Sequence, residues 1–186
     1  MTLKKIVLPL LSLFLLYRTV ELCRYLFAME PSSLTNFGSA ILAVLLSMFV
    51  TGAFAFVGFA YPTNAVLPAA YYSVNNSKLI TSIHDWLGVK YFRKMLLLTF
   101  WGTKKNRKMF FNGTKAGIEN FIHMTKQSEF GHLGALIVLL ILSIILLIQK
   151  HYLLVSVLTV INVIGNLYPI ILQRFHRMRI ASVFNK

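Results

Sequence analysis

An acid and an imidazole stand together at the start of a long apolar segment. Glu129 and His132 lie three residues apart, and the run that follows them, residues 133–148, contains no charged residue. Side chains three positions apart share one face of a helix. A histidine beside a carboxylate is a common arrangement for a general base, in which the acid orients the ring and stabilises its protonated form. We therefore predict that Glu129 and His132 are catalytic, with His132 as the base.

The two apolar segments nearest the C-terminus should form a helical hairpin that gives this pair its partners. Residues 131–148 and 152–172 are separated by a short polar turn, and their lengths are nearly equal at a rise of about 1.5 Å per residue. An antiparallel hairpin of this kind returns the chain to the level from which it started. The residues expected at that level are Glu129, His132, Gln173 and Arg174.

Polar side chains recur along the last segment at helical spacing. Four of them lie 0, 4, 11 and 15 residues from the first, which places them on one stripe of a helix: Asn162, Asn166, Gln173 and Arg177. A polar stripe in a membrane helix must face protein or water rather than lipid. Amide side chains can hydrogen-bond a developing oxyanion, and arginines can hold phosphate or carboxylate groups. The residues predicted to bind substrate here are Asn162, Asn166, Gln173, Arg174, Arg177 and Arg179.

The chemistry that such a set of residues can perform is acyl transfer. A histidine base can deprotonate a hydroxyl that attacks a thioester, while amides stabilise the oxyanion. One histidine and one carboxylate do not make a metal site, so we expect neither a metal nor a tightly bound cofactor. The co-substrate would be an acyl-CoA or an acyl carrier protein, whose negative charge suits the basic residues Lys104, Lys105, Arg107 and Lys108.

Composition predicts that a membrane positions these residues. Of the 186 residues, 57% are hydrophobic and 13% are charged, whereas soluble domains carry about a quarter charged residues. A membrane-spanning helix needs about 20 apolar residues. Four segments qualify, so we expect an all-α polytopic membrane protein that forms a single domain. The expected spans are residues 6–27, 39–61, 131–148 and 152–172.

The chain is strongly basic, with 19 Lys and Arg residues against 5 Asp and Glu residues. Residues 71–128 interleave ten Lys and Arg residues with aromatic ones, which is typical of amphipathic helices that lie on an anionic lipid leaflet. Because this segment lies between expected spans, nucleic acid is not an expected partner. With four spans, the strongly basic flanks all fall on one side, which predicts that both termini are cytoplasmic.

Two blocks of the sequence resemble the glycosyl-4,4'-diaponeurosporenoate acyltransferase family, small bacterial membrane enzymes of carotenoid tailoring. Residues 125–132 have the pattern Thr-Lys-x-x-Glu-x-x-His, and residues 166–179 begin with Asn and end Gln-Arg-x-x-Arg-x-Arg. A looser likeness covers residues 89–94. The resemblance implies transfer of a fatty acyl group to a sugar hydroxyl of a glycosylated lipid at the bacterial inner membrane. It also implies that Glu129 and His132 are catalytic, with support from Asn166, Gln173, Arg174 and Arg177.

Other interpretations of these residues stay open. Asn and Gln in membrane helices often serve as interhelical contacts, and arginines near a helix end can be membrane anchors. The chain would then be a non-enzymatic membrane assembly subunit, or it would be another lipid-modifying enzyme, such as a methyltransferase or a reductase. The sequence does not give the oligomeric state, and it assigns no role to Arg18, Glu21 and Arg24 in the first segment.

Overall fold

The computed structural model describes residues 3–99, 103 and 114–184 of the chain. The secondary structure of this part is helical, and none of its residues lies in a β-strand. The chain divides into two compact units. The first unit comprises Met1–Pro62 and Gly131–Leu167, and the second unit comprises Thr63–Phe130 and Tyr168–Lys186.

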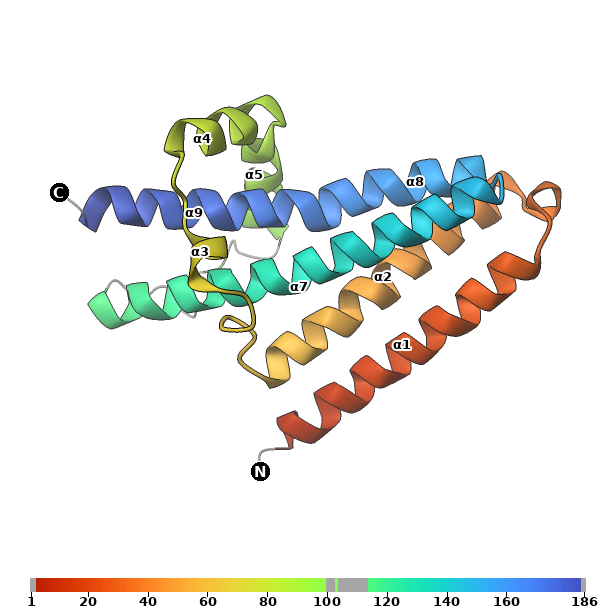
Figure 1. The fold of residues 1–186 in the computed structure, drawn as a ribbon, viewed down its shortest axis with the longest axis horizontal. Coiled ribbons are helices and arrows are strands. Elements are labelled where there is room, and N and C mark those ends of the chain that lie inside the picture. Colours follow the sequence, from red (N-terminus) through yellow and green to blue (C-terminus); the bar gives the residue numbers. More distant parts are fainter. Residues whose placement is uncertain (1–2, 100–102, 104–113, 185–186) are drawn as a thin grey trace. The chain divides into compact units, whose positions relative to one another are not determined.

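Long helices lie side by side in the first unit. They are α1 (Lys4–Ala28), α2 (Asn36–Ala60), the C-terminal part of α7 (Lys115–Ile148), α8 (Tyr152–Asn162) and the π-helical turn η2 (Val163–Leu167), with the short turn η1 (Pro31–Ser33) between α1 and α2. Helix α1 packs against α2, and α2 packs against α8 (Figure 1). Thr35 caps the start of α2, because its Oγ1 accepts a hydrogen bond from the N–H of Gly38 at 3.0 Å.

Small residues let the helices of the first unit approach closely. A Cβ on Gly52 of α2 would lie 2.7 Å from a methyl group of Leu15 on α1. A Cβ on Gly134 of α7 would lie 2.3 Å from the ring of Phe54 on α2. Glycine at these positions therefore permits contacts that any side chain would block. The buried apolar core of the unit consists of Leu26, Ala43, Leu46, Val50, Ala135, Leu139, Leu146, Leu154 and Leu158.

A tight turn joins α7 to α8, at the position where the sequence predicts a hairpin. Lys150 has a φ of 67°, in the left-handed region that commonly ends helices. The N–H groups of Lys150 and His151 donate to the carbonyls of Leu147 and Leu146 at 2.9 and 3.0 Å. These bonds satisfy carbonyls that the end of α7 would otherwise leave open.

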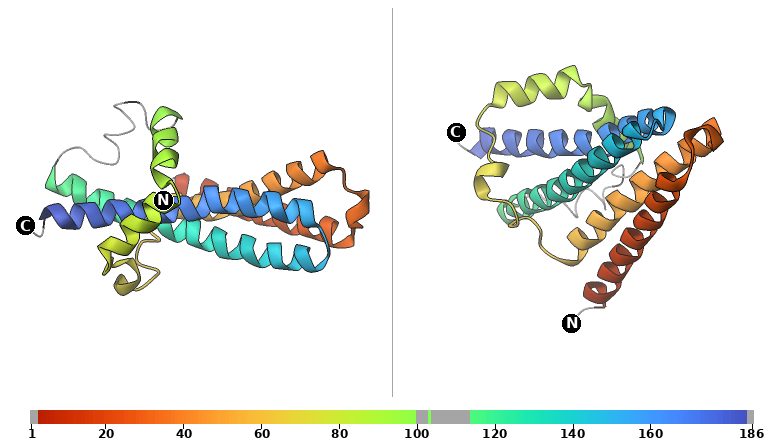
Figure 2. Two further views of the ribbon diagram at one scale, coloured as in Figure 1. Left: turned by 90° about the horizontal axis from the view of Figure 1, so that it is seen from above. Right: turned by 45° about the vertical axis from the view of Figure 1, so that its right-hand side comes forward.

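The second unit contains shorter helices packed on one long helix. The shorter helices are α3 (Ala69–Tyr72), α4 (Ser77–Trp86) and α5 (Val89–Thr99), and the long helix is α9 (Tyr168–Phe184). The N-terminal part of α7 also belongs to this unit. Asn76 caps α4 by accepting the N–H of Leu79 at 2.9 Å, and Gly88, with a φ of 66°, makes the turn from α4 to α5. Both helices contact α9 (Figure 2). The ring of His84 on α4 stacks on Phe175 of α9 at a centroid distance of 4.0 Å.

The predicted fold class, an all-α membrane protein with about four spans, is confirmed. The third span belongs to a helix that begins at Lys115, well before residue 131. The central segment contains the amphipathic helices α4 and α5, and on α4 Trp86 is exposed whereas His84 is buried. The helices that are long and apolar enough to cross a membrane are Lys4–Ala28, Asn36–Ala60, Gly117–Ile148 and Tyr152–Ser182.

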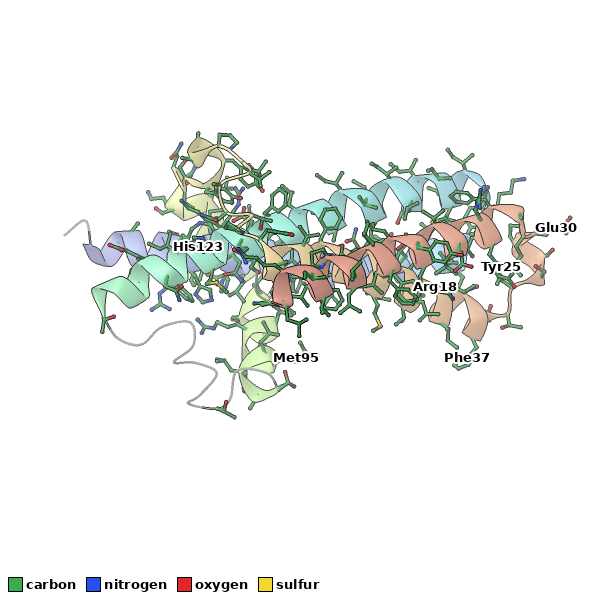
Figure 3. The ribbon with its side chains drawn as sticks, turned by 90° about the horizontal axis from the view of Figure 1, so that it is seen from below. Arg18, Tyr25, Glu30, Phe37, Met95 and His123 are labelled. Carbon is green, nitrogen blue, oxygen red and sulfur yellow. The ribbon has the colours of Figure 1, made fainter. Side chains whose placement is uncertain are left out.

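An ion pair lies on the exposed side of α1. Arg18 and Glu21 bond to one another, and their side chains are 47% and 42% exposed. Figure 3 shows Arg18 and Tyr25 projecting from this helix. An exposed pair of this kind contributes about 1 kcal/mol at most, so its effect is to neutralise two charges within an apolar helix.

The contact between Phe54 and Gly134 predicts what one added methyl group does to α7. Gly134→Ala places a Cβ against the ring of Phe54, so the ring or the helix must move. This displacement should lower the free energy of unfolding by about 1–3 kcal/mol. Gly131→Ala is the matched control, because its Cβ would lie 3.9 Å from the Phe54 carbonyl oxygen, an ordinary contact. Thermal unfolding in detergent, followed by circular dichroism, should give a lower midpoint for Gly134→Ala. Equal midpoints would contradict this packing.

Candidate functional site

A chain of amide side chains holds His132 in the first unit. The ring Nδ1 of His132 lies 3.1 Å from Oδ1 of Asn166, which is fully buried. Asn166 donates from Nδ2 to Oδ1 of Asn162 at 2.9 Å and to Oγ1 of Thr51 at 3.2 Å. Asn162 in turn donates from Nδ2 to the backbone carbonyl of Leu136 at 3.2 Å. The helices α2, α7 and α8 and the turn η2 therefore all contribute to one hydrogen-bonded network.

The direction of this network determines which nitrogen of the histidine carries the proton. The carbonyl of Leu136 can only accept, so the amide nitrogen of Asn162 must face it. The amide oxygen of Asn162 then accepts from Asn166, and the amide oxygen of Asn166 faces the ring. His132 consequently donates from Nδ1 and is left with a lone pair on Nε2. This is the form of histidine that can take a proton.

A proline explains why the helix is irregular beside this histidine. Pro169 has no N–H, so the carbonyl of Gly165, four residues earlier, cannot make its α-helical hydrogen bond. The helix widens into a π-helical turn over Val163–Leu167, a geometry often found at functional sites. The turn thus presents the side-chain oxygen of Asn166 to the imidazole.

A buried carboxylate between two arginines forms a separate cluster in the second unit. Glu129 has no exposed surface. Its Oε1 accepts a hydrogen bond from Nε of Arg174 at 2.7 Å, and its Oε2 accepts one from Nη2 of Arg177. A buried carboxylate is stable only when its charge is neutralised and its oxygens are bonded, and both conditions are met here.

Two tyrosines and a lysine complete this cluster, and sequence analysis did not assign them to it. The guanidinium carbon of Arg174 lies 4.8 Å from the ring centre of Tyr71, and that of Arg177 lies 5.6 Å from that of Tyr72. The ammonium of Lys126 lies 5.5 Å from the Tyr72 ring. Burial, and secondarily the charge of Glu129, raise the pKa of both tyrosine hydroxyls, so they stay protonated at neutral pH.

The cluster of the second unit has an excess of positive charge and of hydrogen-bond donors. Two guanidinium groups, of Arg174 and Arg177, contact one carboxylate, and a third cationic group, of Lys126, lies against the Tyr72 ring that Arg177 also faces. Within the part of the chain that the structure describes, Nε and Nη1 of Arg177 and the hydroxyl of Tyr72 are buried and have no hydrogen-bond partner. Unpaired guanidinium N–H groups are the groups that bind phosphate or carboxylate oxygens.

The remaining predicted residues are placed as follows. Gln173 donates from Nε2 to Oγ of Ser128 at 3.4 Å, and Arg179 is exposed on α9. Among the residues described, no group of three or more potential metal ligands occurs. The predicted donor-binding residues Lys104, Lys105, Arg107 and Lys108 lie outside the described residues.

The signal that pointed to Tyr71, Tyr72 and Lys126 was present in the sequence. These residues belong to the segment in which basic and aromatic residues alternate, and we interpreted that pattern as a membrane surface. The same pattern also allows cation–π contacts within the protein, which require knowledge of which residues meet.

Comparison with known proteins identifies the family. A family model for glycosyl-4,4'-diaponeurosporenoate acyltransferase matches residues 68–186. The chain belongs to this family. The match includes both blocks from which the resemblance was predicted, residues 125–132 and 166–179, and membership supports acyltransferase activity. No curated protein and no solved structure gives a significant match to the chain.

The buried carboxylate of this family member predicts a large effect on stability. Glu129→Gln leaves two guanidinium groups without their counter-charge, which should lower the free energy of unfolding by about 3–5 kcal/mol. Glu119→Gln, an exposed carboxylate on the same helix, should change it by less than about 0.5 kcal/mol. Denaturant titration of the purified variants measures both values. Similar stabilities for the two variants would show that the arginines do not depend on Glu129.

Proposed function

We propose that the protein is a membrane acyltransferase that moves a fatty acyl group from a thioester donor to a hydroxyl of a glycosylated carotenoid or another lipid. Family membership supports the reaction type and the class of acceptor. The observation that carries the proposal is the network from Leu136 to His132, because it leaves Nε2 of a half-buried histidine free to act as a base.

The reaction proceeds by direct transfer in this proposal. The hydroxyl oxygen of the acceptor attacks the carbonyl carbon of the thioester, while Nε2 of His132 takes the hydroxyl proton. The tetrahedral intermediate collapses with cleavage of the carbon–sulfur bond. The departing sulfur takes the proton back from the imidazolium. The products are an ester and a free thiol, and the histidine returns to its starting form.

Asn166 is the positioning residue for this base. Its oxygen accepts a hydrogen bond from the Nδ1–H of His132 before the reaction, and this hydrogen bond becomes stronger once the ring is positively charged. Thr51 and Asn162 hold the amide in the required orientation. Sequence analysis gave the orienting role to Glu129. In this proposal Glu129 instead fixes Arg174 and Arg177, because both of its oxygens accept hydrogen bonds from them.

The arginine cluster of the second unit binds the anionic part of the donor in this proposal. An acyl-CoA or the phosphopantetheine arm of an acyl carrier protein would supply phosphate oxygens to Arg174, whose side chain is 26% exposed. The basic run of residues 104–108 would add attraction for the same donor. The bacterial inner membrane, with both termini in the cytoplasm, is the location that matches the charge distribution and the supply of thioesters.

Substitution of His132 tests the proposed base. His132→Ala should lower kcat for acyl transfer by about 10²–10⁴-fold, the usual contribution of a general base. Asn166→Leu should cause a smaller loss, because the ring remains but is no longer held. His123→Ala is the matched control on the same helix and should keep the wild-type rate; Figure 3 shows His123. The assay follows ester formation by purified protein in lipid nanodiscs.

The outcome that would contradict the proposed base is full activity of a folded His132→Ala variant. If the variant instead stays inactive only because a partner protein no longer associates with it, the non-enzymatic assembly role would gain support.

Substitution of Arg174 tests the donor site separately. Arg174→Gln should raise the KM for a fatty acyl-CoA about 10–100-fold, because it removes charge-assisted hydrogen bonds. The KM for a fatty acyl thioester of N-acetylcysteamine, which has no phosphate, should not change. Lys94→Gln, an exposed lysine on α5, is the control and should leave both values unchanged. An equal rise of KM for both thioesters would exclude phosphate recognition by Arg174.

A further inference from the structure

Helix α5 carries apolar side chains on two of its faces. One face meets α9, where the ring of Phe92 packs edge-on against Tyr168 at a centroid distance of 5.7 Å. The other face bears Tyr91, Met95 and Leu98, whose intervals of four and three residues place them on one helical stripe. All three are exposed, Leu98 to 75%, and Figure 3 shows Met95 on this helix. A helix packed on a protein in water normally has polar residues on the side away from its partner.

The neighbouring helix α4 repeats this arrangement. Its His84 is buried and stacks on Phe175 of α9. Leu79 and Trp86, which are seven residues apart and so share one side of α4, are exposed, Trp86 to 85%. Helix α9 therefore covers only part of the apolar surface of both helices. We call five of the uncovered residues the exposed apolar face: Leu79, Trp86, Tyr91, Met95 and Leu98.

Basic side chains accompany the exposed apolar face. Lys78 lies on α4 and is exposed, and the ammonium group of Lys90 lies 5.2 Å from the ring centre of Tyr91. Residues 77–99 contain four Lys and Arg residues against one acidic residue, Asp85. Apolar and aromatic residues beside an excess of lysine are typical of helices that lie on anionic lipid, because the ammonium groups attract lipid phosphates while the apolar side chains insert.

The helix that carries α4 and α5 brings them next to a bilayer. Both pack on α9, which is part of Tyr152–Ser182, a helix long and apolar enough to cross a membrane. Trp and Tyr are enriched at the level of lipid headgroups, where a ring meets both hydrocarbon and water, and Trp86 and Tyr91 belong to the exposed apolar face. A second copy of the chain would bring lysines against the same basic surface, which the repulsion of like charges opposes. Anionic lipid instead compensates that charge.

We propose that the exposed apolar face inserts at the headgroup level of an anionic lipid leaflet, with Lys78 and Lys90 bound to lipid phosphates beside it. The sequence predicted a lipid surface for the whole of residues 71–128, and the exposed residues limit that contact to one face of α4 and α5. The contact adds a surface anchor to the membrane-crossing helices, and it does not depend on the reaction that the protein catalyses.

The fluorescence of Trp86 tests this contact. The chain has two tryptophans, so Trp101→Phe leaves Trp86 as the sole emitter. The full-length variant is placed in nanodiscs of phosphatidylglycerol and phosphatidylcholine, and lipid brominated on the acyl carbons nearest the headgroup should quench most of its emission. Emission that the brominated lipid leaves unchanged overturns the inference. In that case quenching by aqueous iodide would show that Trp86 faces water, and protection from iodide would show that protein covers it.

Two matched variants in the Trp101→Phe background test the insertion of the apolar stripe. Leu98→Glu places a charge in the stripe and should reduce the quenching of Trp86 by brominated lipid, because a carboxylate is costly in hydrocarbon. Thr99→Glu adds the same charge one residue along, outside the stripe, and should keep the quenching. Both residues are exposed, so neither change disturbs the core. Equal quenching of the two variants would overturn the insertion.

The two lysines are tested by lipid composition. Quenching of Trp86 should be stronger in nanodiscs that contain phosphatidylglycerol than in phosphatidylcholine alone, and Lys78→Gln/Lys90→Gln should remove this difference. Because both lysines are exposed, the double variant should keep its fold. No difference between the lipids, or the same difference in the double variant, would overturn the assignment to anionic lipid. None of these measurements uses acyl transfer, so their failure leaves the proposed function untouched.

Discussion

A polar side chain in an apolar helix must find a partner, and this requirement governs the structure around α7. Hydrocarbon offers no hydrogen bonds, so each buried charge or amide needs a second residue of the chain as its hydrogen-bond or ion-pair partner. Glu129 is the most demanding case, because an ionised carboxylate without exposed surface needs positive charge at both oxygens. Arg174 and Arg177 supply that charge, and their positions one turn apart on α9 allow both to reach one carboxylate.

The same requirement acts on His132 with a different result. Its partners are neutral amides. His132 bonds to Asn166, Asn166 bonds to Asn162, and Asn162 bonds to the backbone carbonyl of Leu136, where the series of hydrogen bonds ends. A network that ends at a group able only to accept has one direction, and that direction leaves Nε2 without a proton. The contacts that satisfy these hydrogen bonds thus also leave a lone pair on the ring.

The sequence predicted the fold class and the spans because both depend on local composition. It also predicted that polar residues near the ends of the last two apolar segments would have partners, and the structure places Arg174 against Glu129. It did not predict the contacts of Tyr71 and Tyr72, since a cation–π contact depends on which helices meet rather than on spacing.

The partner of His132 also had to come from the structure. Glu129 and Asn166 both have side chains suited to orient an imidazole, and spacing along the chain favoured Glu129. In the structure both oxygens of Glu129 accept hydrogen bonds from the two arginines, and Nδ1 of His132 bonds to Asn166. Asn166 reaches the histidine from a π-helical turn. That turn arises because Pro169 offers no N–H to the carbonyl four residues before it, an effect that the spacing of hydrophobic residues does not reveal.

The central claim, acyl transfer to a hydroxyl whose own oxygen attacks the acyl carbon, is tested most directly by the oxygen atom in the product. Purified protein in nanodiscs is given palmitoyl-CoA and glycosyl-4,4'-diaponeurosporenoate whose sugar hydroxyls carry oxygen-18, and the product is analysed by mass spectrometry. The account predicts an ester that retains the label, with one free CoA released for each ester formed. Absence of ester, or an ester that has lost the label, would contradict it.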